Sequence, residues 1–196
     1  NPQIRGMADQ LAKQGYLSLA LDLYRGKVTD NPEQAHELMR GLPEDRALRD
    51  LTAAVAYLKA SPDVKPDRIG SIGWCMGGGY PLKLAVAEPA LAACAVYYGA
   101  LPTEPQTLAA INTPVIGFFG DKDDGIPEES VLAFDSAMQK LQKPVEVHVY
   151  RNAGHAFANS SSKNFQHFAA EDAWKKLMDF FTKHLKGNGD SQTSAR

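Results

Sequence analysis

The sequence has few cysteines and no long apolar run, and each absence excludes a class of protein. Its 196 residues include only two cysteines, Cys75 and Cys94, too few for a disulfide framework. A single disulfide between them is the alternative, and their different local sequences argue against it. No apolar run approaches the roughly 20 residues that a membrane-spanning helix needs. Because no basic-then-apolar leader follows Asn1 either, we expect no membrane partner and a cytoplasmic location.

The chain also lacks an excess of charge of one sign. It has 21 Lys and Arg residues against 23 Asp and Glu residues, so no basic patch for nucleic acid is expected. No pair of Cys or His residues has metal-ligand spacing, so we expect no metal; no other cofactor is expected either. The length of 196 residues predicts one domain, over residues 1–186, and the hydrophobic fraction of 44% is ordinary for a globular protein. The polar tail at residues 187–196 is expected to be disordered.

Short apolar segments alternate with amphipathic ones along the chain. Apolar runs bounded by turn residues predict buried strands at residues 16–21, 68–73, 92–98, 114–119 and 144–150. Helical spacing predicts helices at residues 4–14, 32–40, 44–59, 78–87, 128–141 and 164–185. This alternation predicts an α/β fold with a mostly parallel sheet of about five strands and helices on both faces. Ligands of such sheets bind at the carboxyl ends of the strands.

One turn at such an end has the pattern of a nucleophile elbow. Gly73-Trp74-Cys75-Met76-Gly77 follows a predicted strand and precedes a predicted helix. In this tight turn, side chains in place of Gly73 and Gly77 would clash. The turn raises Cys75 above the sheet, where the helix N-terminus stabilises a thiolate and the Met76 N–H points at a developing oxyanion. The alternative is a tight turn around a buried, inert cysteine.

Two further turns supply a candidate acid and a candidate base. Residues 120–127 (GDKDDGIP) follow the fourth predicted strand and offer Asp121, Asp123 and Asp124. A solvated turn with a helix-capping acid is the alternative for this cluster. His155 follows the last predicted strand, whereas the other four histidines lie in predicted helices or within a strand. Nucleophile, acid and base therefore occur in the chain order of α/β-hydrolases, each after its own strand.

These motifs resemble the dienelactone hydrolase family, a cysteine-nucleophile branch of the α/β-hydrolases. The resemblance runs from Asn1 to about Leu185 and is carried by QGYLSLALDLYRGK, IGSIGWCMGGGY, YYGA, GDKDDGIP and NAGHAFAN. It implies an α/β-hydrolase fold with Cys75 as nucleophile and His155 as base. It also implies that Asp123 is the triad acid, because Asp123 matches the acid of the family's G-x-x-D-x-x-[Ile/Val]-Pro pattern. The implied reaction is hydrolysis of a carboxylic ester or lactone through a thioester.

The chain departs from the family at two substrate-binding positions. Dienelactone-specific members hold the substrate carboxylate with two arginines, where this chain has Asn159 and, near Pro32 and Glu33, no arginine. Asparagine replaces a bidentate arginine poorly, so we expect a neutral ester, with dienelactone as the alternative. Core packing is the alternative role for the aromatic candidates. The candidate substrate contacts are Tyr24, Arg25, Trp74, Phe157 and Asn159.

Family members also begin with about three more strands, so the resemblance implies an N-terminally shortened fold. The loop ending the third strand carries a glutamate that interacts with the cysteine, and supplies the second oxyanion-hole N–H. With only the Met76 N–H, the oxyanion hole is half built, and loss of one donor lowers rates by about 10²–10³. The missing strands leave residues 16–21 near an exposed sheet edge. We therefore expect either a truncated form or a homodimer through that edge.

Two other functions fit the same residues. The half-built oxyanion hole favours a binding protein that keeps the fold and has lost efficient turnover. An exposed cysteine of low pKa favours a redox-sensing thiol. Turnover of an activated ester separates the hydrolase from both alternatives, and peroxide sensitivity of Cys75 labelling separates the alternatives from each other.

Overall fold

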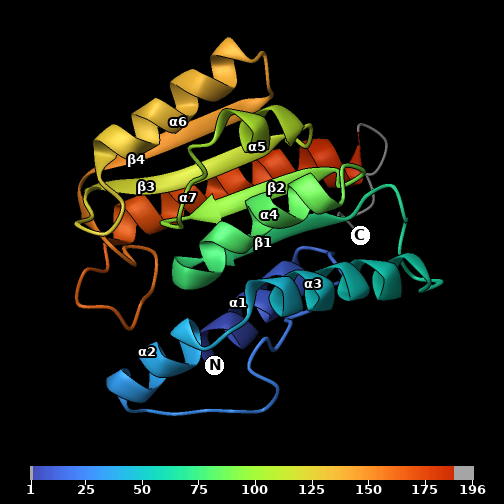
Figure 1. Ribbon diagram of the computed structural model, residues 1–196, viewed down its shortest axis with the longest axis horizontal. Helices are drawn as coiled ribbons and strands as arrows, with labels where there is room; N and C mark the ends of the chain where they lie inside the picture. The colour runs from blue at the N-terminus through green and yellow to red at the C-terminus, as the bar shows by residue number, and fades with distance from the viewer. Residues whose placement is uncertain (1, 188–196) are drawn as a thin grey trace, which may run out of the picture. The chain divides into compact units, whose positions relative to one another are not determined.

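The computed structural model describes residues 2–187, and the chain divides into two compact units between Pro66 and Asp67. The first unit contains helices α1 (Pro2–Lys13), α2 (Pro32–Arg40) and α3 (Glu44–Lys59) (Figure 1). The Asn31 side chain caps α2 by accepting hydrogen bonds from two backbone N–H groups of its first turn. Helix α3 fixes the segment before α2, because Arg46 donates to the Leu23 carbonyl and Arg25 pairs with Asp50 at 2.9 Å.

The predicted strand at residues 16–21 is wrong. This segment has no regular secondary structure and pairs with no strand within residues 2–187. Its apolar composition satisfies the sequence pattern of a strand, but a strand also needs a neighbour to accept and donate its backbone hydrogen bonds. The sheet edge proposed for a homodimer is therefore not formed by these residues, and the homodimer stays a prediction.

The second unit contains a four-stranded, all-parallel sheet in the order β1-β2-β3-β4, one strand fewer than predicted. Its strands are β1 (Gly70–Trp74), β2 (Ala93–Tyr97), β3 (Val115–Lys122) and β4 (Val145–Gly154). A 3₁₀-helix (Cys75–Gly79) follows β1 and leads into α4 (Tyr80–Ala87). The remaining helices are α5 (Pro105–Ala110), α6 (Glu128–Lys140) and α7 (His167–Phe181), which ends in a π-helical turn (Thr182–Lys186). The predicted α/β fold is thus confirmed.

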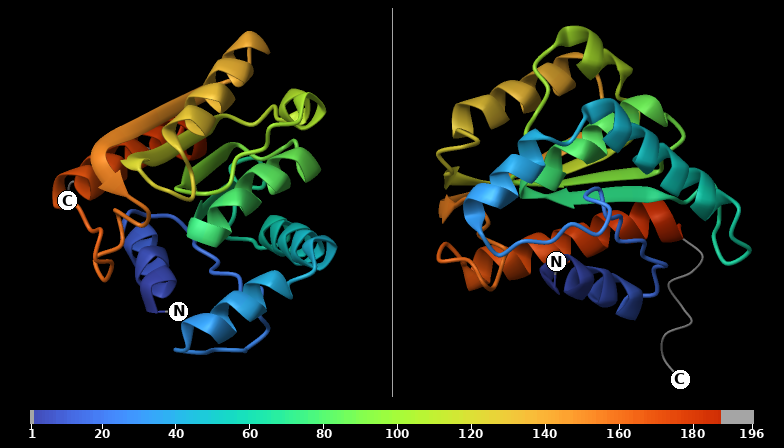
Figure 2. Two further views of the ribbon diagram at one scale, coloured as in Figure 1. Left: turned by 60° about the vertical axis from the view of Figure 1, so that its left-hand side comes forward. Right: turned by 60° about the horizontal axis from the view of Figure 1, so that its bottom comes forward.

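Helices cover both faces of this sheet (Figure 2). On one face α4, α5 and α6 form a single apolar cluster with one set of strand side chains, which includes Leu82, Cys94, Ile111, Val131 and Met138. On the other face α7 packs on β3 and β4 and buries its own apolar stripe, Ala169, Ala173, Leu177, Phe180 and Phe181. The hydroxyl of Tyr150 on β4 donates to Asp172 of α7 at 2.8 Å, which joins this face by a polar contact as well.

The ends of several elements differ from the prediction for local reasons. The helix predicted at residues 78–87 begins as a 3₁₀ turn. The short helix α5 was not predicted, because its six residues show no helical periodicity. Helix α7 begins at His167, three residues later than predicted, because residues 155–166 form a loop that folds back on the end of β4.

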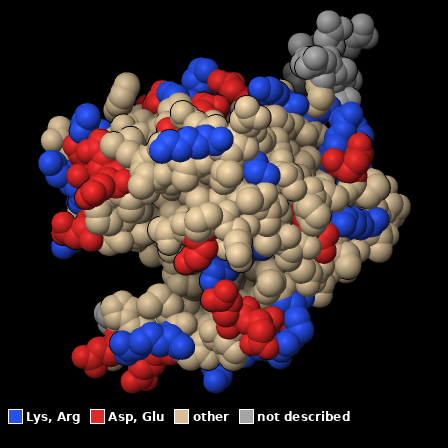
Figure 3. Space-filling view, turned by 45° about the horizontal axis from the view of Figure 1, so that its top comes forward, with Lys and Arg blue, Asp and Glu red and all other residues tan. Residues whose placement is uncertain are grey.

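The surface and the chain end bear on the remaining expectations. Lys and Arg side chains are interspersed with Asp and Glu on the face shown in Figure 3. Within residues 2–187, no helix is both long enough and apolar enough to cross a membrane. The tail predicted to be disordered lies outside the described residues, except for Gly187. The prediction of one domain over residues 1–186 stays a prediction.

Candidate active site

An irregular pairing of β3 with β4 brings two polar residues together at the carboxyl ends of these strands. The strands pair regularly as far as Gly120 with Tyr150, and then Lys122 pairs with Gly154. Between these two pairs β4 contains two more residues than β3. The extra residues form a bulge that includes Asn152 in the left-handed region (φ 59°). Since Asp123 and His155 directly follow the last pair, the bulge places them opposite each other.

Gly120 allows this bulge because the backbone of β4 crosses directly over it. A Cβ atom at position 120 would lie 2.1 Å from the Ala153 carbonyl oxygen, far inside van der Waals contact. The neighbour is backbone, so it cannot rotate away as a side chain could. A residue without a side chain is therefore required at position 120.

Cys75, His155 and Asp123 form a continuous line of hydrogen bonds. His155 Nε2 lies 3.0 Å from Cys75 Sγ, and His155 Nδ1 lies 2.8 Å from Asp123 Oδ2. The Asp123 side chain is 1% exposed, the His155 side chain is 38% exposed, and Cys75 is exposed. The line thus runs from a buried carboxylate to an accessible sulfur.

Of the three aspartates in the acid turn, Asp123 is the one that contacts His155. Its second oxygen, Oδ1, accepts hydrogen bonds from the backbone N–H groups of Gly125 (2.9 Å) and Ile126 (3.1 Å). These bonds satisfy the buried carboxylate and fix its rotation toward His155. Asp121 instead contacts Arg151 at 3.4 Å, and Asp124 is exposed.

The two reactive groups shift each other's pKa in opposite directions. The hydrogen bond from His155 lowers the pKa of Cys75 against the opposing effect of burial, and the Met76 backbone N–H lowers it further. The hydrogen bond to Cys75, aided by Asp123, raises the pKa of His155 to about 9. These opposite shifts both favour the ion pair of a Cys75 thiolate and a His155 imidazolium over the neutral pair. Cys94 shows the contrast, since complete burial raises its pKa to about 12.

The nucleophile turn is strained at its central residue. Cys75 has φ 56°, a left-handed conformation that side chains disfavour. A Cβ atom at Gly73 would lie 2.1 Å from the Gly77 carbonyl oxygen, so the glycine is required there, as predicted. The prediction for Gly77 is wrong, because a Cβ atom there would meet nothing within 4 Å. Of the two glycines, only Gly73 would direct a Cβ atom into the backbone of the turn.

The imidazole of His155 packs against buried aromatic rings. The Tyr98 ring lies 5.3 Å from the imidazole in an edge-on arrangement and 5.4 Å from the Phe157 ring. Tyr98 and Phe157 are 1% and 0% exposed, respectively, so they form part of the core beneath the site. Burial raises the pKa of Tyr98, so its hydroxyl stays protonated near Cys75.

The structure places the five predicted substrate contacts in different surroundings. Trp74 precedes Cys75, is partly buried and packs on the Tyr97 ring, whereas Phe157 is fully buried. Asn159 accepts a hydrogen bond from the Ser161 N–H within the loop after His155. Tyr24 and Arg25 belong to the first unit. Substrate contact stays a prediction for all five residues.

A residue that the sequence analysis missed also holds the site. Asn164 donates from Nδ2 to the backbone carbonyl of His155 at 2.9 Å. No local pattern marks this residue, which lies nine positions after the histidine inside a polar loop. Within residues 2–187, no group of three or more His, Cys, Asp or Glu side chains is arranged to hold a metal ion.

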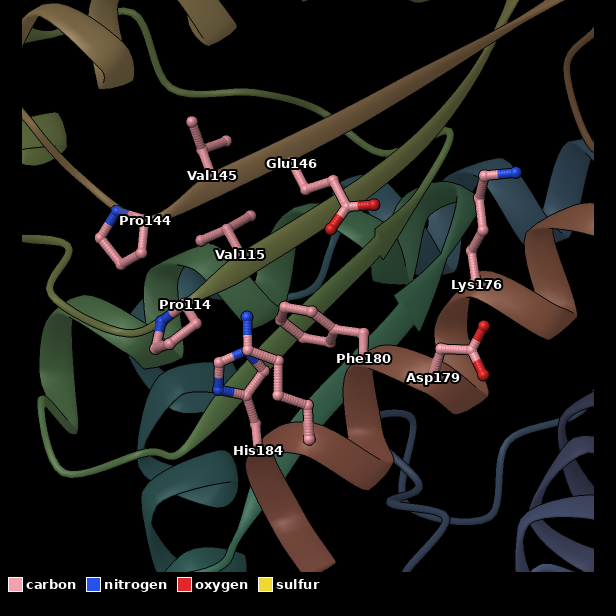
Figure 4. A pocket seen from close by; sticks show the side chains of 10 residues that line it. Pro114, Val115, Pro144, Val145, Glu146, Lys176, Asp179, Phe180 and His184 are labelled. Atoms are coloured by element: carbon pink, nitrogen blue, oxygen red, sulfur yellow. The ribbon is translucent and has the colours of Figure 1, made fainter. Parts of the chain in front are cut away.

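A cavity of about 370 Å³ lies elsewhere, at the amino ends of β3 and β4 beside α7 (Figure 4). Several of its charged side chains are paired: Lys176 with Asp172, Asp179 with Lys175 and Glu146 with His148. Its lining contains no cysteine or serine. Asp123 and His155 lie at the opposite end of the same strands, directly after their carboxyl ends.

Comparisons with known proteins agree on one family. The model described as "Dienelactone hydrolase family" matches residues 1–185. A candidate 2-oxo-3-(5-oxofuran-2-ylidene)propanoate lactonase from Bradyrhizobium sp. is 32% identical, over 95% of this chain and 80% of the relative. A candidate carboxymethylenebutenolidase from Escherichia coli K12 is 30% identical, over 92% of this chain and 72% of the relative. The crystal structure of a candidate dienelactone hydrolase from Klebsiella pneumoniae superposes with a TM-score of 0.85 at 28% identity, over 93% of this chain and 82% of that chain.

The bulge predicts a large difference between two glycine substitutions. Gly120→Ala should lower the free energy of unfolding by about 1–3 kcal/mol, because its Cβ meets the Ala153 carbonyl. Gly77→Ala, for which the surroundings are open, should change it by less than about 0.5 kcal/mol. Urea unfolding of both variants measures the difference. Equal midpoints would show that β4 does not cross Gly120 in solution.

The shifted pKa of Cys75 predicts selective alkylation by iodoacetamide. One thiol per folded chain should react, at pH values below the ordinary thiol pKa of about 8.5, because the thiolate is the nucleophile. His155→Gln should move the midpoint of the rate to higher pH, since it removes the hydrogen bond that lowers the pKa. Cys94→Ser is the control and should leave the rate unchanged. Fast labelling of Cys94 in the folded protein would contradict its burial.

Proposed function

Because the chain belongs to the dienelactone hydrolase family, we propose that it hydrolyses a carboxylic ester or lactone through a thioester on Cys75. One observation carries the proposal: the hydrogen-bonded line from Asp123 through His155 to Cys75, with contacts of 2.8 and 3.0 Å. A thiolate supplies the nucleophile, and an imidazolium held beside it supplies the proton for the leaving group.

In the first half of the reaction, the Cys75 thiolate attacks the substrate carbonyl carbon. A C–S bond forms and the carbonyl electrons move to oxygen, where the Met76 N–H stabilises the negative charge. When the tetrahedral intermediate collapses, the C–O bond to the leaving group breaks and His155 gives its Nε2 proton to the departing alkoxide. In a lactone this alkoxide is part of the same molecule, so the opened ring stays attached as the acyl group.

In the second half, neutral His155 removes a proton from water. The resulting hydroxide attacks the thioester, a second tetrahedral intermediate forms and the C–S bond breaks. The product leaves as a carboxylic acid or its carboxylate, and Cys75 returns to the thiolate beside a protonated His155. Asp123 accepts the Nδ1 hydrogen bond throughout and so keeps Nε2 directed at the sulfur.

The proposed substrate is small and its recognised group is neutral. The names of the relatives from Bradyrhizobium and Escherichia coli describe hydrolysis of lactones that carry a carboxylate, so they support the lactone but not the absence of charge. Asn159 is engaged within its own loop, where it accepts the Ser161 N–H, and it carries no charge to hold a carboxylate. The absence of a charge at Asn159 favours an uncharged ester or lactone over a carboxylate-bearing dienelactone.

Turnover of short p-nitrophenyl esters and of a neutral lactone tests the proposal. The wild type should hydrolyse them, and Cys75→Ala at matched concentration should lose activity to the background rate, because no thioester can form. Cys94→Ala is the matched control and should retain turnover. Equal activity of wild type and Cys75→Ala would remove Cys75 as nucleophile. No turnover in either would favour the binding-protein alternative.

The pH dependence of kcat/KM tests the thiolate–imidazolium pair. The rate should rise as Cys75 loses its proton, at a pH below that of an ordinary thiol, and fall as His155 loses its proton near pH 9. Asp123→Asn removes a hydrogen bond that raises the pKa of His155, so the alkaline limb should move to lower pH. An alkaline limb that stays in place in Asp123→Asn would contradict this assignment.

A further inference from the structure

The loop after β4 holds His155 in a backbone that needs external support. Asn152 in the bulge has φ 59°, and Ala156, directly after the histidine, has φ 61°. Such left-handed conformations are unfavourable for residues with a side chain and persist where the surroundings fix them. The carbonyl groups around His155 therefore need partners that hold this path of the chain.

Asn164 provides a partner at the histidine itself. Its Nδ2 donates to the His155 carbonyl at 2.9 Å, and its own backbone N–H is fixed by Ser162 Oγ at 3.0 Å. A Cβ atom at Gly154 would lie 3.1 Å from this Nδ2, so the amide lies directly against the residue before His155. Asn164 thus hydrogen-bonds to the His155 carbonyl and lies beside Gly154, where it fills the space that a side chain would need.

Gln166 makes similar hydrogen bonds to residues on either side of His155. Its Nε2 donates to the Asn152 carbonyl, and its backbone N–H donates to the Phe157 carbonyl at 3.0 Å. Helix α7 begins one residue later, at His167, and packs on β3 and β4. The two amides therefore tie the strained turn to a helix that is itself anchored on the sheet.

We propose that Asn164 is a positioning residue for His155. It reaches the backbone of the histidine and acts through it: the fixed carbonyl sets where the imidazole lies between Asp123 and Cys75. This inference rests on the proposed function, in which His155 exchanges protons with the leaving group and with water. A displacement of about 1 Å in such a group lowers rates by up to about 100-fold. Loss of the amide should therefore lower kcat by about 10- to 100-fold and leave KM nearly unchanged.

The test compares Asn164→Ala and Asn164→Asp with the wild type. Aspartate keeps the shape of asparagine but, when ionised, has no N–H to donate, so it removes the bond without opening a cavity. Asn112→Ala is the matched control, because Asn112 also donates its amide to a backbone carbonyl, that of Ala110, outside the site. For each variant we would measure the urea midpoint, kcat and KM on a p-nitrophenyl ester, and the pH midpoint of Cys75 alkylation.

We expect both Asn164 variants to fold, to lose kcat and to shift Cys75 alkylation to higher pH, because a displaced His155 no longer supports the thiolate. Asn112→Ala should match the wild type in kcat and in alkylation. Folded Asn164 variants with wild-type kcat and alkylation would overturn the proposal. Loss of fold in both variants would also overturn it in favour of a purely structural role.

The alkylation profile separates this inference from the proposed function. It reports the position of His155 relative to Cys75 without any substrate turnover. If the wild type hydrolyses no ester or lactone, the proposed function fails. The shift of the alkylation midpoint in Asn164→Ala, which adds no charge beside the site, still decides whether Asn164 positions His155.

Discussion

The pairing of Lys122 with Gly154 is the contact on which the candidate site depends. If β3 and β4 kept their regular register to the end, Asp123 and His155 would not be opposite each other. The bulge adds two residues to β4 and moves the histidine into line with the acid. Gly120 makes this possible because it leaves space for the Ala153 carbonyl. Cys75 directly follows β1, the edge strand farthest from β4, and its sulfur lies within 3.0 Å of His155 Nε2.

Strain is concentrated at the turns that carry the reactive groups. Cys75, Tyr98, Asn152 and Ala156 all have positive φ, and all lie at or near carboxyl ends of the strands. Strained backbone of this kind is held by a rigid frame, and the frame here is a sheet packed on both faces by helices. Apolar packing elsewhere in the same unit therefore offsets the conformational strain of the site.

Two cysteines in one unit show how completely the surroundings decide chemistry. Cys75 is exposed and hydrogen-bonded to His155, which lowers its pKa, whereas Cys94 is buried in the apolar cluster, which raises its pKa to about 12. The first thiol is therefore more easily ionised than an ordinary one, and the second behaves as a small apolar residue. The same reasoning explains Asp123 and Asp121, since two residues in one turn meet different partners.

The sequence by itself determined the parts of this protein that depend on local pattern. Alternating apolar and amphipathic segments predicted the α/β fold, and the three turns predicted which cysteine, histidine and aspartates to consider, because each turn type has a local steric signature. Tertiary structure alone decided the rest. Residues 16–21 form no strand because strand pairing is a long-range event. The bulge at Asn152, the grip of Asn164 on His155 and the opposed pKa shifts of Cys75 and His155 arise from contacts between segments distant in the chain, and no local pattern encodes them.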